Sequence, residues 1–137
     1  MSHITKVKSK ITDISLLKKT LADLKMQYTE ITQENPIEIK SWNKENIVKD
    51  MQLEIKTGSS YNVGVIFNEK TKTHEFVADW WGVESYSGIN KDDFINKISQ
   101  KYAYNNVMDK IKDKGYQVVN EEVDDKQNLR IVLRKWQ

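Results

Sequence analysis

The fold is decided by residues 51–80, which read MQLEIKTGSSYNVGVIFNEKTKTHEFVADW. Apolar side chains occupy every second position of the first two segments: Met51, Leu53, Ile55, Tyr61, Val63, Val65 and Phe67. Turn residues at Gly58–Ser60 and at Asn68–Lys72 separate these segments from a third, which runs from Thr73 to about Trp80. Because short connections join antiparallel neighbours, the stretch predicts an antiparallel three-stranded meander.

The segment before the meander contains a strand and a helix. Residues 3–11 alternate, with Lys6, Lys8 and Lys10 on the outward face. Asp13 is expected to cap a helix with one apolar stripe. The stripe consists of Ile14, Leu17, Leu21 and Leu24. Between residues 26 and 50 the pattern suggests short strands at Tyr28–Ile31 and Ile37–Trp42 around Pro36, followed by a turn at Asn43–Asn46.

A second helical region follows the meander. Asn90 is expected to cap it. Its apolar residues change sides, from Phe94, Ile95, Ile98 and Tyr102 to Val107, Met108 and Ile111. Either the helix breaks near residues 104–106, which we favour, or its two ends are buried on different sides. Gly115 is expected to end it.

A terminal hairpin is expected at about 116–123 and 129–135, with Leu129, Ile131 and Leu133 directed inward. Grouped strands predict a single α+β domain over residues 1–137. Its antiparallel sheet has five or more strands, and two helical segments pack on one face. The expected core is Leu17, Leu21, Leu24, Leu53, Val63, Val65, Phe94, Ile98, Ile131 and Leu133.

Composition excludes several classes of chemistry. The chain has no cysteine and two histidines, His3 and His74, so disulfides, thiol nucleophiles and cysteine-ligated metal centres are excluded. We therefore expect no bound metal and no cofactor. The net charge of +2 does not by itself indicate nucleic-acid binding. No apolar run is long enough to span a membrane, and the N-terminus resembles neither a signal nor a transit peptide.

Known catalytic motifs are missing from the sequence. The five glycines do not cluster before a helix, so a phosphate-binding loop is not expected. The acidic pairs have structural explanations at a helix start or beside a turn, and no catalytic residue is assigned. A deep pocket lined by His74, Asp79 and Tyr102 would favour an enzyme with dispersed site residues.

The unusual stretch is 78–86, which reads ADWWGVESY. Strand alternation would place Trp80 inward and Trp81 outward at the rim of the sheet. An exposed tryptophan is a common anchor for another protein. We therefore take Asp79, Trp80, Trp81 and Tyr86 as candidate protein-docking residues; the alternative is that they only complete the core and cover the rim.

A basic sheet face is the second candidate. Arg130, Arg134 and Trp136 share one face of the last expected strand. If that strand lies near the first, Lys6, Lys8 and Lys10 join them, and the face could hold a polyanion through charge and base stacking. The alternative is a solvated face whose lysines prevent edge-to-edge aggregation.

Six short strings, in their order and spacing, resemble the hypothetical chloroplast reading frame thirty-five family of algal plastids and cyanobacteria. They are Met1-Ser2-His3-Ile4-Thr5, Leu21-Ala22-Asp23-Leu24, Val77-Ala78-Asp79-Trp80, Gln100-Lys101-Tyr102-Ala103-Tyr104, Gly115-Tyr116 and Arg134-Lys135-Trp136. The resemblance spans nearly the whole chain, although Ile4 stands where the family usually has Phe. It implies a plastid stroma or a bacterial cytoplasm and supplies no active site.

Three functions stay open at this point. The leading hypothesis is a non-enzymatic accessory or assembly protein that binds another protein. The alternatives are a binder of nucleic acid or another polyanion, and an enzyme with an unrecognised site.

Overall fold

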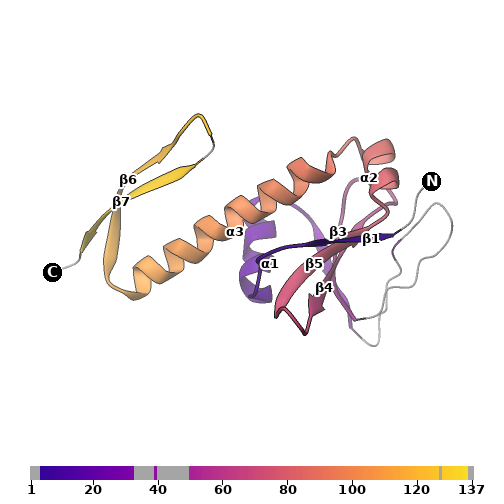
Figure 1. Cartoon of the computed structure of the whole chain (residues 1–137), viewed down its shortest axis with the longest axis horizontal. Helices are drawn as coiled ribbons and strands as arrows, with labels where there is room; N and C mark the ends of the chain where they lie inside the picture. The colour runs from indigo at the N-terminus through magenta and orange to yellow at the C-terminus, as the bar shows by residue number, and fades with distance from the viewer. Residues whose placement is uncertain (1–3, 33–38, 40–49, 127, 136–137) are drawn as a thin grey trace. The chain divides into compact units, whose positions relative to one another are not determined.

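A five-stranded antiparallel sheet forms the first part of the molecule. The computed structural model describes residues 4–32, 39, 50–126 and 128–135. The sheet has the order β1-β5-β4-β3-β2 (Figure 1). Its strands are β1 (Thr5–Lys8), β2 (Tyr28–Glu30), β3 (Met51–Ile55), β4 (Val63–Asn68) and β5 (Thr73–Ala78). The predicted meander is confirmed as β3, β4 and β5, and the α+β class is confirmed with it.

The chain divides into two compact units, Met1–Tyr102 and Ala103–Gln137. The core of the first unit lies between one sheet face and the helices. The register aligns Leu53 with Val65 and Val65 with Phe76, and all three are fully buried. Helix residues from both predicted helical segments pack on this row. They are Leu16, Leu17, Leu21, Phe94, Ile98 and Tyr102. The helices therefore lie on one face of this sheet, as the sequence predicted.

Helix α1 (Ile14–Asp23) begins as its sequence dictates. The carboxylate of Asp13 accepts hydrogen bonds from the backbone N–H groups of Ser15 and Leu16 at 2.9 and 3.2 Å. These bonds satisfy amides that have no partner inside the helix. The predicted cap is confirmed.

The opposite sheet face carries a smaller apolar cluster and two buried acids. Ile39, Met51, Ile66 and Val77 form the cluster. Glu54 is 3% exposed and pairs with Lys56 at 2.5 Å, and Glu75 accepts a hydrogen bond from Asn68 at 3.0 Å. Of the features expected between residues 26 and 50, β2 confirms the first short strand. The strand at 37–42 and the turn at 43–46 lie outside the described residues, apart from Ile39.

Helix α2 (Trp80–Ser87) corrects the expectation that the third strand continues to Trp80. The strand ends at Ala78, and Asp79 caps the new helix by accepting a hydrogen bond from Gly82 N–H at 3.1 Å. Glycine and aromatic residues are poor helix formers, so propensity did not indicate a helix here. Gly88, with φ of 72°, ends it.

Helix α3 (Lys91–Asp113) corrects the predicted break near residues 104–106. It is continuous, and Figure 1 draws it as a single ribbon. Phe94 and Ile98 are buried in the first unit, whereas Ile111 is buried in the second. The change of apolar side thus reflects burial in two units rather than a kink. The start at Asn90 and the end at Gly115, with φ of 79°, agree with the sequence.

The terminal hairpin consists of β6 (Tyr116–Val123) and β7 (Leu129–Lys135), close to the predicted bounds. Within the described part of the chain these strands form a separate two-stranded sheet. Placing Ile131 and Leu133 in the core was therefore wrong: Leu129 and Leu133 are each 40% exposed, and Ile131 is only half-buried. A two-stranded sheet has too little partner surface to bury its apolar face. Leu24, also expected in the core, is half-buried.

Tyr102 fastens α3 to the start of α1. Its buried hydroxyl accepts hydrogen bonds from the backbone N–H groups of Thr12 and Asp13 at 3.2 and 3.0 Å. We expect Tyr102→Phe to lower the free energy of unfolding by about 1 kcal/mol, because the ring stays while the acceptor is lost. Urea denaturation measures this, with Tyr104→Phe as the control because its hydroxyl donates to the exposed Glu121 carboxylate. Equal midpoints for the wild type and Tyr102→Phe would contradict it.

Candidate functional site

Three aromatic rings meet at helix α2. Trp81 and Tyr86 are 46% and 56% exposed, and their ring centroids lie 6.0 Å apart at an interplanar angle of 83°. Tyr61 stacks on Tyr86 at 5.1 Å with the planes nearly parallel, and it is only 5% exposed. We call Tyr61, Trp81 and Tyr86 the aromatic patch. Trp81 and Tyr86 face solvent, and the buried Tyr61 ring supports Tyr86.

Gly82 makes room for the supporting ring. It precedes Tyr86 by one helical turn, so both lie on the same side of α2. A Cβ atom at Gly82 would lie 2.1 Å from Cδ1 of Tyr61, far inside van der Waals contact. Only glycine therefore lets the Tyr61 ring lie directly against the helix.

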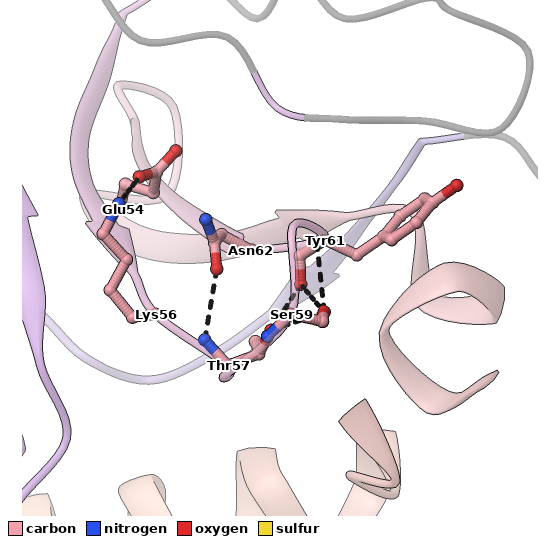
Figure 2. Close-up of polar contacts among 6 residues, drawn as sticks. All are labelled: Glu54, Lys56, Thr57, Ser59, Tyr61 and Asn62. Atoms are coloured by element: carbon pink, nitrogen blue, oxygen red, sulfur yellow. Dashed lines mark hydrogen bonds and ion pairs between the residues drawn. The ribbon is translucent and has the colours of Figure 1, made fainter. Parts of the chain in front are cut away.

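The turn between β3 and β4 holds Tyr61 from the other end. The Thr57 hydroxyl donates to the Tyr61 carbonyl at 2.6 Å, and the Tyr61 N–H donates to the Ser59 hydroxyl at 3.1 Å. Asn62 accepts from Thr57 N–H at 3.1 Å. Figure 2 shows these bonds gathered at the turn while the Tyr61 ring extends away from them. The backbone that carries the ring is thus fixed by side chains of its own turn.

The local environment perturbs the Tyr61 hydroxyl. Burial, the neighbouring Tyr86 and the Asp79 carboxylate, in that order of importance, raise the pKa of Tyr61 above its ordinary value. Each of these effects disfavours the phenolate. The support of the patch therefore stays neutral at physiological pH.

The four docking candidates predicted from the sequence have different roles. Asp79 is fully buried as the cap of α2. Trp80 is 6% exposed, packs its ring 6.3 Å from that of Phe94, and donates from its indole N–H to the Thr5 carbonyl at 3.3 Å. Only Trp81 and Tyr86 present a surface. Asp79 and Trp80 position that surface.

The expected burial of Trp80 and exposure of Trp81 are confirmed, but strand alternation is not the cause. Both residues lie in a helix, where neighbours point about 100° apart. Tyr61 was not predicted as part of the site. Its contact with Gly82 and Tyr86 is formed between segments about twenty residues apart, and no local pattern indicates it.

The basic-face candidates are only partly brought together. Lys6, Lys8, Lys10, Arg130 and Arg134 are all exposed, as expected. However, β1 pairs with β5 in the five-stranded sheet, whereas β7 pairs with β6 in the two-stranded sheet. Among the described strands, the first and the last are therefore not neighbours, and the lysines and arginines do not share one sheet. Acids also stand opposite two of them, Glu75 across from Lys8 and Glu122 across from Arg130. Trp136 lies outside the described residues.

The residues proposed for an enzymatic pocket have separate structural tasks. His74 is buried, with Nδ1 lying 3.0 Å from the Ile11 carbonyl. Asp79 caps α2, and Tyr102 binds backbone amides. A hollow of about 400 Å³ lies beside β2, and none of these three lines it; its lining is Ala22, Met26, Gln27, Tyr28, Thr29 and Lys56.

Two further features are absent from the described residues. These residues contain no group of three or more histidines or acids that could hold a metal ion. Among them we also find no helix that is long and apolar enough to cross a membrane.

Comparison with known proteins identifies relatives of similar length. A family model described as "Protein of unknown function (DUF1257)" matches residues 20–132. The "Uncharacterized protein ycf35" of Guillardia theta is 31% identical, over 99% of this chain and 98% of the relative. The proteins of the same description from Pyropia yezoensis and Cyanophora paradoxa are 29% and 28% identical, with the same coverage. No solved structure gives a significant match.

Proposed function

The chain belongs to the DUF1257 family, in agreement with the resemblance of its short motifs. Within that family, we propose that it is a non-enzymatic accessory or assembly protein that binds another protein. The binding surface is the exposed part of the aromatic patch, Trp81 and Tyr86. The proposed compartment is a plastid stroma or a bacterial cytoplasm.

One observation carries this proposal: two large rings are exposed, yet both are held in place. Trp81 makes an edge contact with Tyr86, and Tyr86 stacks on buried Tyr61. Tyrosine and tryptophan offer large contact areas, and rings that are already ordered lose little entropy on binding. Hot spots of protein interfaces are enriched in these two residues. The supported patch therefore suits a protein partner.

The two alternative functions receive less support. A deep pocket lined by His74, Asp79 and Tyr102 would favour an enzyme, but each of the three is buried in a structural role. Polyanion binding would need a continuous basic sheet face. The lysines of β1 and the arginines of β7 belong to different sheets in the described chain, and acids stand among them.

The test is capture of the partner by variants of the patch. We expect Trp81→Ala to weaken capture by at least about 1 kcal/mol, or roughly fivefold. The change should lower the free energy of unfolding by about 1 kcal/mol or less, because half of the ring is already in water. Tagged wild-type and variant chains would be purified from the native compartment, with the retained protein quantified by mass spectrometry and the variant melted in parallel.

Val107→Ala provides a matched control, because Val107 is also an apolar helix residue and is 42% exposed. It should retain the partner fully. If Trp81→Ala retains as much partner as Val107→Ala, the aromatic patch is not the docking surface.

A further inference from the structure

We propose that the partner presents a basic segment to the aromatic patch, with an arginine side chain against Trp81 and Tyr86. This inference rests on the proposed docking function and adds the chemistry of the partner. It follows from the charges that surround the patch and from the angle between its two exposed rings.

The sequence around the patch is acidic although the chain as a whole is basic. Residues 79–93 contain four carboxylates and a single amine, Lys91, whereas the net charge of the whole chain is +2. The carboxylates are Asp79, Glu84, Asp92 and Asp93. Asp79 is buried as the cap of α2, so its charge would act on a partner through its electric field and not through direct contact. The other three are exposed.

Helix geometry places Glu84 beside Trp81. The two residues are three apart on α2, a spacing that makes side chains neighbours on a helix surface. A carboxylate oxygen of Glu84 also accepts a hydrogen bond from the Lys91 N–H at 3.0 Å, which ties it to the first turn of α3. Asp92 and Asp93 lie in that turn. The exposed acids are therefore grouped around one end of the patch.

The rings favour a guanidinium over other side chains. The ring planes of Trp81 and Tyr86 are nearly perpendicular, at 83°, so a partner side chain can stack on the face of one ring while the other ring contacts its side. Aromatic faces attract cations, and arginine stacks on them while its N–H groups remain able to bond carboxylates. Lysine has no flat surface to stack, an acidic group would be repelled by Glu84, Asp92 and Asp93, and a neutral donor would gain a hydrogen bond but no charge attraction.

The experiment is an NMR titration of the full chain with short probe peptides. The probe is an acetylated, amidated peptide of alternating glycine and arginine, and matched peptides carry lysine or glutamate in place of arginine. The reporter is the indole N–H resonance of Trp81, assigned by its loss in Trp81→Phe. We expect a saturable shift with the arginine peptide, a weaker one with lysine, and none with glutamate.

Glu84→Gln should weaken binding of the arginine peptide by about 1.4- to fivefold, the range of a single exposed charge pair. Glu69→Gln is the matched control, because Glu69 is an exposed acid of the β4–β5 turn. Rising salt should weaken binding to the wild type further.

The outcomes separate this inference from the function on which it rests. If Trp81→Ala loses its natural partner but the arginine peptide leaves the Trp81 indole unshifted, docking stands and the basic partner is refuted. Equal shifts by the arginine and glutamate peptides, or equal affinities of Glu84→Gln and Glu69→Gln, also refute it. If Trp81→Ala retains the partner and the arginine peptide leaves the wild-type Trp81 indole unshifted, both proposals fail.

Discussion

Trp80→Ala is expected to lower the free energy of unfolding by about 3–5 kcal/mol, the range for removing a large aromatic side chain from a core. Trp80 is 6% exposed and joins three elements. It starts α2, packs against Phe94 of α3, and donates its indole N–H to the Thr5 carbonyl of β1. Its loss would leave a cavity where these elements meet.

Chemical denaturation of Trp80→Ala and Trp81→Ala, side by side, measures the difference. Adjacent tryptophans should differ several-fold in their effect, because one ring is buried and the other is half in water. Trp80→Phe should recover much of the loss, since it restores packing but not the hydrogen bond to Thr5. A larger destabilisation by Trp81→Ala than by Trp80→Ala would reverse the assignment of the two rings.

Gly82→Ala should destabilise the protein by about 2 kcal/mol, the middle of the range for overpacking a filled site. Alanine favours a helix over glycine by about 1 kcal/mol, so propensity alone predicts the opposite sign. The steric term should dominate, because the new methyl group would lie 2.1 Å from a ring atom of Tyr61. That ring is buried and its backbone is fixed by the β3–β4 turn.

A double-mutant cycle tests the cause of this effect. In a Tyr61→Ala background, Gly82→Ala should be neutral or stabilising, because the obstructing ring is gone. Ser85→Ala, at an exposed position of the same helix, controls for general changes in helix stability. If Gly82→Ala costs the same with and without the Tyr61 ring, the proposed support beneath Tyr86 is wrong.

Local patterns predicted the elements whose causes are local. Alternation of period two located β3, β4 and β5, and the caps Asp13 and Asn90 located the starts of two helices. Helix α2 was not predicted because it is short and contains Gly82, and because its cap Asp79 directly follows a strand. No residue of the local sequence marks the end of β5 at Ala78.

Features that depend on distant partners could not be read in this way. The apolar residues of β7 look like core positions, and their exposure follows only from the pairing of β7 with β6 in a separate sheet. The continuity of α3 likewise depends on burial in two units. In the candidate site, Trp81 was identified by its type, whereas Tyr61 required the contact between the β3–β4 turn and α2.

The docking role of the aromatic patch is tested most directly by photo-crosslinking from within it. Three variants would each carry one benzoylphenylalanine, at position 81, at position 86 or, as a control, at exposed Lys19 of α1. Each variant would be irradiated in the native compartment. Positions 81 and 86 should both yield the same discrete adduct to a second protein, and position 19 should not. No adduct from position 81, or the same adduct from all three positions, would contradict docking through Trp81 and Tyr86.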